Sequence, residues 1–295
     1  MNRARTVASA LVAALGVAAL VALLLHTGPA RVAEVLGRMG GGIAVAAVLE
    51  GLRIASETWG ARAMYGPGLV PRRSLLRAQL VGYALCYVLP VGRAVAEACK
   101  VPMLSPFVLR ARVVGVALAN QAMALLAVGF ASAACLALTG AGCPRPLATV
   151  LGLHAAATLA VGAVLWALSA RRMPPEGKRI ALGSMLLSRA LQAASVLAIV
   201  HAASPGAGVL DALRVWGLHL LGASAGDVAL AQVGFTDGAL VLGASAAHLD
   251  AASALSIALG VRLAQMTWVL LGAVAAGLLS PGPPQRSICI PSSTT

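Results

Sequence analysis

Long stretches without a charged residue are the feature that most limits how this chain can fold. Val7–Leu25 and Val113–Thr139 contain no charged side chain, and Leu147–Ala170 contains none apart from any charge on His154. A helix needs roughly 20 apolar residues to cross the hydrocarbon core of a bilayer. Only 11% of the 295 residues are charged, whereas soluble domains carry about 25%. We therefore expect an all-α integral membrane protein.

The net charge of +13 does not indicate a nucleic-acid-binding protein. The basic residues gather in short segments between apolar stretches, at 62–77 and 171–179, as the positive-inside rule predicts for cytoplasmic loops. Aromatic residues make up 3% of the chain, so bases would find no stacking surface. The five cysteines lack a C-x-x-C spacing and the histidines lack the spacing of metal ligands. We therefore expect no metal, no cofactor and no nucleic-acid partner.

Placing both basic segments in the cytoplasm sets the direction of the remaining segments. The loop from His26 to Met39 is then expected outside, and both chain ends are expected in the cytoplasm. Residues 1–279 form one polytopic domain, and the polar tail 280–295 is expected to be disordered. The first apolar stretch exceeds the 7–15 residues typical of a cleaved signal peptide, so we expect a retained helix. Six full spans are expected: Val7–Leu25, Ile43–Trp59, Val113–Thr139, Leu147–Ala170, Ile180–Val200 and Ala251–Leu279.

The segment between Arg77 and Arg112 is predicted to enter the membrane and return. Both arginines belong on the cytoplasmic side, and one full span between them would separate them. Its limbs, Leu75–Leu89 and Ala94–Leu109, flank the sequence PVGR. Each limb of about 15 residues reaches about 22 Å, which is short of a core of about 30 Å. We predict a re-entrant hairpin, with simple spanning helices as the alternative.

A second broken-helix hairpin is predicted to enter from the opposite face. Its limbs are Ala212–Ala225 and Val228–Ala247, joined by SAGD, and the spacing of Gly222 and Gly226 permits close helix approach. Discontinuous helices that enter from opposite faces are typical of many secondary transporters.

Charged residues inside these apolar segments are the candidates for function. A charge at mid-membrane costs at least a few kcal/mol, so it usually faces the interior of a bundle and often marks a pathway. Structural ion pairs that lock helices together are the alternative explanation. The candidates are Glu50, Arg53, Glu57, Arg93, Glu97, Lys100, Arg189, Asp227, Asp237 and Arg262.

Two of these groups have spacings that predict particular contacts. Glu50, Arg53 and Glu57 lie at i, i+3 and i+7, so one arginine can pair with both carboxylates on one helix face. Asp237 and Arg262 lie on the second hairpin and the last helix, and a turn between them is expected to bring them into contact. We expect this pair to face the first hairpin.

The first hairpin is the strongest candidate for a binding site. Arg93, Glu97 and Lys100 follow the helix breaker Pro90, so cationic side chains lie near the positive end of a half-helix. Such an arrangement favours an anion.

Intramembrane proteolysis is not favoured. The sequence GASA occurs at Gly222 and Gly243 and resembles the serine motif of such proteases, but the pattern places no histidine partner. The AGD that ends at Asp227 lacks the rest of the aspartyl protease pattern. No nucleotide-binding fingerprint is present, and we expect the protein not to be an enzyme.

The stretch GYALCYVLPVGRAVAEACK resembles the first signature of the lysylphosphatidylglycerol synthase transmembrane-region family, whose members carry a flippase-like domain. The matching residues are Pro90, Gly92, Glu97 and Lys100. The stretch from Ala229 to Leu263 is similar to the second signature of the family, with Gly234, Asp237 and Arg262 in the matching places. The family usually has Glu in place of Asp237 and Pro in place of Ala231.

The resemblance implies a bacterial cell-membrane protein that moves lipids between leaflets. It implies that Arg93, Lys100 and Arg262 contact a lipid headgroup, and that Glu97 and Asp237 pair with them in the empty site. Membrane lipid would be both substrate and surroundings, with a homo-oligomer or a separately encoded protein as a possible partner. The alternatives are a non-transporting membrane scaffold with structural ion pairs and a small-solute transporter. A lipid path needs a groove open to the bilayer, whereas a solute path needs a closed cavity.

Overall fold

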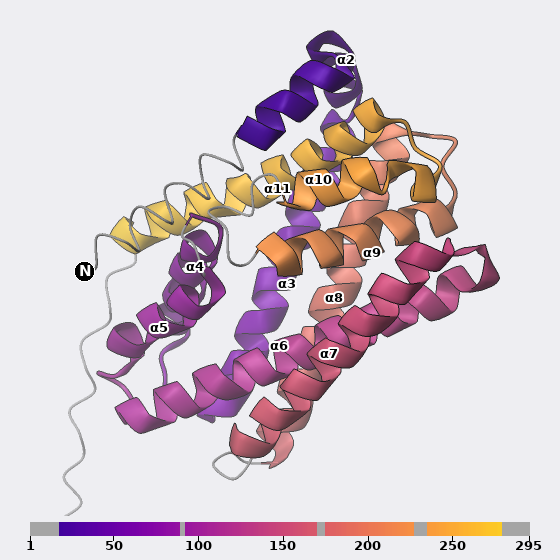
Figure 1. Ribbon diagram of the computed structural model, residues 1–295. Coiled ribbons are helices and arrows are strands. Elements are labelled where there is room, and N and C mark those ends of the chain that lie inside the picture. The colour runs from indigo at the N-terminus through magenta and orange to yellow at the C-terminus, as the bar shows by residue number, and fades with distance from the viewer. Residues whose placement is uncertain (1–17, 89–91, 170–174, 227–234, 279–295) are drawn as a thin grey trace, which may run out of the picture.

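The protein is a bundle of helices of unequal length, as Figure 1 shows. The computed structural model describes residues 18–88, 92–169, 175–226 and 235–278. Within these ranges the chain is helical and forms no strand, which confirms the all-α prediction. Predictions that concern Pro90, Asp227, Gly234, residues 7–17 and the tail 280–295 lie outside the described residues.

Four helices are long and apolar enough to cross a membrane. They are α6 (Arg110–Thr139), α7 (Arg145–Ser169), residues 177–203 of α8 (Pro175–Ala203) and residues 251–275 of α11 (Ala251–Leu278). Large apolar side chains such as Leu153, Leu168 and Leu270 are exposed on their outer faces, as expected where lipid is the solvent. The structure therefore supports an integral membrane protein, and the four helices correspond to four of the six expected spans.

Helix α3 (Gly40–Tyr65) contains the expected span Ile43–Trp59 and packs antiparallel along α8. Near one end, a Cβ atom added to Gly42 would lie 2.6 Å from Cβ of Ala202. Near the other end, a Cβ atom on Gly60 would lie 2.3 Å from Oγ of Ser184. The two glycines let the helix backbones approach closely at both ends, so α3 has a long partner that can cover its charged residues.

The prediction of a loop from His26 to Met39 is wrong, because most of this segment is helix α2 (Pro29–Arg38). Val32 and Val35 are buried and α2 packs against α11, while Glu34 and Arg38 are exposed. The preceding helix, Ala18–Thr27, meets α2 at 89°. The pair counts as a fifth membrane crossing only if it is one broken span. The polar residues suggested a loop, yet the valines follow the spacing of an amphipathic helix.

The region of the first predicted hairpin contains two antiparallel helices, α4 (Arg72–Val88) and α5 (Gly92–Leu104), which pack together. A Cβ atom on Gly92 would lie 2.1 Å from the carbonyl oxygen of Cys86, and Gly82 packs against Ala96 and Lys100. With 17 and 13 residues, the helices reach about 25 and 20 Å. The second limb ends at Leu104, five residues before the expected Leu109.

The second hairpin consists of α9 (Val209–Gly226) and α10 (Phe235–Leu242), followed by a short 3-10 helix (Ala244–Ala247). A Cβ atom on Gly222 would lie 2.7 Å from Cα of Thr236, which confirms the role predicted for this glycine in close helix approach. The described part of the second limb, residues 235–247, consists of α10, which has 8 residues, and the 3-10 helix.

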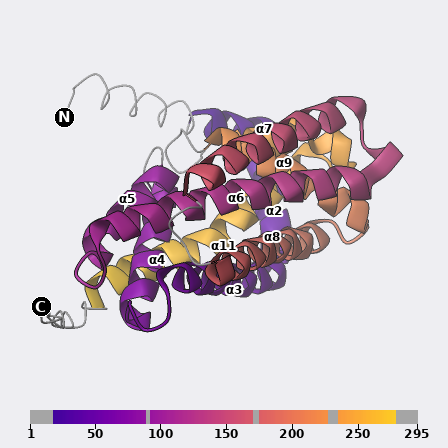
Figure 2. The same ribbon diagram turned by 90° about the horizontal axis from the view of Figure 1, so that it is seen from below.

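The two hairpins begin at opposite ends of the bundle (Figure 2). Leu75 at the start of α4, Leu104 at the end of α5 and Val113 at the start of α6 share one apolar cluster. Ala212 at the start of α9 belongs to another cluster, with Leu147 at the start of α7. The first end carries the basic segment 62–77 together with Arg110 and Arg112, and the positive-inside rule predicts that this end faces the cytoplasm.

We predict that single cysteines replacing Arg77 and Arg112 are labelled by an impermeant maleimide from the same face of the membrane. A cysteine replacing Arg145, at the start of α7, is expected to react from the opposite face. The background is a variant in which the native cysteines are replaced. Labelling of positions 77 and 112 from opposite faces contradicts the hairpin.

Candidate functional site

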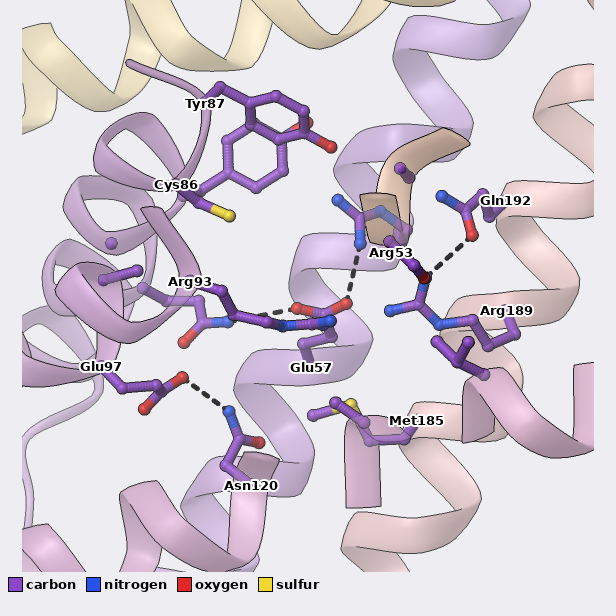
Figure 3. A pocket seen from close by; sticks show the side chains of 18 of the residues that line it. Arg53, Glu57, Cys86, Tyr87, Arg93, Glu97, Asn120, Met185, Arg189 and Gln192 are labelled. Carbon is purple, nitrogen blue, oxygen red and sulfur yellow. Dashed lines mark hydrogen bonds and ion pairs between the residues drawn. The ribbon is translucent and has the colours of Figure 1, made fainter. Parts of the chain in front are cut away.

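A polar cavity of about 110 Å³ lies inside the bundle between the two hairpins (Figure 3). Residues of α3, α4 and α5 line it together with residues of α6, α8 and α9. Its charged lining residues are Arg53, Glu57, Arg93, Glu97, Lys100 and Arg189. The fold therefore brings together most of the charges that the sequence singled out.

Arg53 is neutralised by both neighbouring carboxylates on α3, as its spacing predicted. Its Nε and Nη2 atoms lie 3.0 and 2.6 Å from the two carboxylate oxygens of Glu50, and its Nη1 lies 2.9 Å from Oε1 of Glu57. The hydroxyl of Tyr83 on α4 also donates to Glu50. Glu50 and Arg53 are buried, so this group forms an ion network inside the protein.

Glu57 connects this network to two further helices. It accepts hydrogen bonds from Oγ of Ser188 on α8 at 2.7 Å and from Nε2 of Gln79 on α4 at 3.4 Å. Together with Arg53, these donors join α3, α4 and α8 around one carboxylate. The network thus fixes the position of the first hairpin against the long helices.

Glu97 on α5 pairs with Lys100 and is also held by a residue that sequence reasoning missed. Its Oε1 lies 2.7 Å from Nζ of Lys100 and accepts a hydrogen bond from Nδ2 of Asn120 on α6 at 2.8 Å. Asn120 is a polar residue in a long apolar stretch without charges. This polarity was the sequence signal that could have identified it as a site residue. Gly92 begins α5, and Arg93 extends from the next position toward Glu57 (Figure 3).

Arg189 on α8 is the cavity residue with the least complete pairing. Its side chain is buried, and its Nη1 donates to Oε1 of Gln192 at 2.8 Å. No carboxylate oxygen of a described residue lies within 4.0 Å of its guanidinium, and its Nε has no hydrogen-bond partner there. The sequence indicated it only as one of several charges in apolar segments, and the structure places it in the cavity wall.

Asp237 and Arg262 form the ion pair that the sequence predicted. Nε and Nη2 of the arginine each lie 2.8 Å from one carboxylate oxygen, and Asp237 is fully buried. The pair joins α10 to α11. Neither residue is among the described residues that line the cavity, and the pair braces the second hairpin against α11.

The sequence pattern placed no histidine beside the GASA serines, but the structure does. Nε2 of His154 on α7 lies 2.9 Å from Oγ of Ser224 on α9, and its Nδ1 lies 3.0 Å from Oγ of Ser132 on α6. Ser224 lies two residues before the end of α9 at Gly226, where free backbone groups are carbonyls. The three side chains lie on α6, α7 and α9, so we interpret the group as a polar bridge between three helices.

A second polar group closes the end of the bundle opposite the basic segment. Asp211 at the start of α9 pairs with Nη1 of Arg214 at 2.7 Å and with Nδ1 of His248 at 3.0 Å. Arg214 also donates to the carbonyl of Gly142 at 2.7 Å. Nearby, Asp250 accepts the backbone N–H groups of Ala252 and Ser253 and caps α11. Partial burial raises the pKa of Asp250, but its hydrogen bonds outweigh burial and hold the pKa below its usual value.

An apolar groove of about 530 Å³ lies between α5 and α6 and meets the polar cavity. Ala94 and Ala98 of α5 form one wall, and Val114 and Leu118 of α6 form part of the other. All four side chains are exposed, so the groove opens sideways to the surroundings of the bundle. Arg93 and Glu97 line both the groove and the polar cavity. These two residues therefore stand where an apolar path meets a polar site.

No group of three or more metal-binding side chains occurs in the part of the chain that the structure describes. Comparisons of the chain with protein-family models, curated proteins and solved structures find no match. The resemblance to the flippase-like family therefore stays a prediction that depends on the residues quoted above.

We predict that Asp237→Asn and Arg262→Gln each lower the free energy of unfolding more than the double variant does. Each single change leaves one buried charge without its partner, whereas the double change leaves none. The coupling free energy from a double-mutant cycle is expected to be about 0.5–3 kcal/mol. Unfolding in mixed micelles measures it.

The control is the exposed pair Glu34 and Arg38 on α2, whose nearest atoms lie 3.8 Å apart. Exposed pairs contribute little, so Glu34→Gln and Arg38→Gln should act additively. Additive effects at Asp237 and Arg262 as well would contradict the predicted bracing role.

Proposed function

We propose that the protein moves a lipid with a polar headgroup between the leaflets of a membrane. The observation that carries this proposal is the junction at Arg93 and Glu97, where a sideways-open apolar groove meets a buried polar cavity. A lipid has the same two parts in the same order. Its acyl chains would lie in the groove between α5 and α6 while its headgroup enters the cavity.

The proposed topology has six full spans and two re-entrant hairpins, in a bacterial cell membrane with both chain ends in the cytoplasm. Helix α3 counts as a span because it packs along α8, although its charges make it less apolar. Helices α4 and α5 enter from the basic end, and α9 and α10 enter from the other. Opposed broken helices around a central site suit alternating access, and membership of the flippase-like family is part of the same proposal.

The charges of the first hairpin suggest how a headgroup is received. In the observed state Glu97 pairs with Lys100 and Asn120. An arriving headgroup would exchange for part of this pairing, so that Arg93 and Lys100 contact its anionic part. Exchange between internal and ligand partners keeps Glu97 and Lys100 neutralised, which lowers the cost of holding charges in a low-dielectric site.

A membrane scaffold with structural ion pairs is a second candidate. The fully paired Glu50, Arg53 and Glu57 network favours it, because such pairing needs no ligand. A scaffold gives no reason for Arg189, which is buried without a carboxylate partner among the described residues. The lipid proposal supplies a reason, since a headgroup brings the missing anion.

We predict that Arg93→Ala and Glu97→Ala abolish lipid movement without preventing membrane insertion. Both residues stand at the junction that a headgroup must pass. Labelled lipids in proteoliposomes report movement between leaflets, and size-exclusion chromatography checks the fold. Arg110→Ala, at the exposed start of α6, is the control and should move lipid normally. If both junction variants move lipid at the normal rate, the headgroup site is wrongly assigned to Arg93 and Glu97.

We predict that Ala98→Trp lowers lipid movement to the rate of protein-free vesicles. The indole would fill the groove where acyl chains are proposed to lie. Ala160→Trp, at an exposed position of α7, adds the same bulk outside the groove and should have no effect. If the protein instead transports a small solute through the cavity alone, Ala98→Trp leaves transport unchanged.

A further inference from the structure

Arg189 is a buried cation with no carboxylate oxygen of a described residue within 4.0 Å of its guanidinium. Its side chain is 6% exposed and lines the polar cavity. Its Nη1 is used by the neutral amide of Gln192, and its Nε has no partner. Burying a guanidinium without a counter-charge is costly. A ligand that supplies a negative charge beside Arg189 would offset this cost.

The surroundings of Arg189 carry an excess of positive charge. Figure 3 shows Arg93 and Arg189 directed toward Glu57 from opposite sides, with Arg53 already bound to that carboxylate. Glu50 is held by Arg53 and Tyr83. Glu97 and Lys100 neutralise one another at 2.7 Å. Three arginines thus face two carboxylates, and both carboxylates already have donors of their own.

We propose that Arg189, together with Arg93, binds the phosphate group of the transported lipid. A phosphate oxygen accepts the N–H groups of a guanidinium in a forked geometry, so it can use the free Nε of Arg189. This inference rests on the proposed function and deepens it, because it restricts the substrates to phosphate-bearing lipids.

The position of Arg93 connects this phosphate site to the apolar groove. Arg93 lines both the cavity and the groove between α5 and α6. In a phospholipid the phosphate lies between the acyl chains and the rest of the headgroup. A phosphate held between Arg189 and Arg93 therefore leaves its chains directed toward Ala94 and Ala98.

Arg189→Gln gives a test that separates ligand binding from structural support. The change leaves each cavity carboxylate with the partners that it now has, because Glu57 keeps Arg53 and Ser188. Without ligand, the melting temperature of the variant should equal or exceed that of the wild type, since a poorly paired buried cation is gone. If Arg189 supports the fold, the melting temperature falls instead and the proposal is overturned.

Binding is measured on the purified full chain with three probes: short-chain phosphatidylglycerol, a short-chain glucosyl diacylglycerol without phosphate, and inorganic phosphate. Wild-type protein should bind phosphatidylglycerol, and Arg189→Gln should weaken this binding at least about tenfold, as expected for a lost charged hydrogen bond. Arg189→Lys keeps the charge but loses the forked N–H groups, so its affinity for phosphatidylglycerol should lie between those of the wild type and Arg189→Gln. Arg179→Gln, exposed on the same helix, is the matched control and should bind like the wild type.

The probes also separate the sources of the phosphate. Equal binding of the glucosyl lipid and phosphatidylglycerol overturns the proposal, as does unchanged binding by Arg189→Gln. Inorganic phosphate that binds as tightly as phosphatidylglycerol supports phosphate recognition but removes the lipid as its source.

The proposal and the proposed function can fail separately. Wild-type protein that moves both lipids equally in proteoliposomes retains the transport function and overturns phosphate selection. Wild-type protein that moves neither lipid, yet binds phosphate through Arg189, supports the anion site and removes lipid transport.

Discussion

The pairing of charges inside an apolar bundle is the constraint on which this structure depends. Water is absent from a bilayer core, so each buried charge needs a partner from the protein. Helix α3 meets this need with its own residues, since Arg53 lies between Glu50 and Glu57. The two carboxylates also accept hydrogen bonds from Tyr83 and Gln79 on α4 and from Ser188 on α8. The same bonds that neutralise α3 therefore hold the first hairpin against the bundle and so form one side of the cavity.

The two hairpins contribute differently to the site. The first brings Arg93, Glu97 and Lys100 into the cavity wall, so its charges face the interior space. The second contributes Ser224 near the end of α9, while its own charge, Asp237, is bound by Arg262 of α11. The charges of the first hairpin thus face the cavity, whereas the charge of the second hairpin is bound within the protein. In the proposed transport function, the second hairpin would be the fixed element and the first hairpin the element that responds to a ligand.

Local spacing accounts for the parts of the structure that the sequence could predict. The long apolar spans and the partners of Arg53 follow from run length and helical periodicity, which need no knowledge of other helices. Even Asp237 and Arg262 were predictable, because a short turn leaves them few alternatives. The loop expected over residues 26–39 was wrong since polar residues outweighed the spacing of Val32 and Val35. Contacts such as Asn120 with Glu97 depend on how helices tilt against each other, and no local pattern encodes that.

Three arginines of the bundle differ in how completely they are paired with carboxylates. Arg53 has two carboxylates and Arg262 has one in a forked geometry. Arg189 has a neutral amide. The fold therefore neutralises two of these arginines with carboxylates. At Arg189, by contrast, the residue within hydrogen-bond distance is the neutral Gln192. An anion supplied from outside would recover the electrostatic energy that the empty site forgoes. Incomplete pairing at Arg189 would thus cost stability in the protein alone and strengthen the binding of the proposed phosphate group.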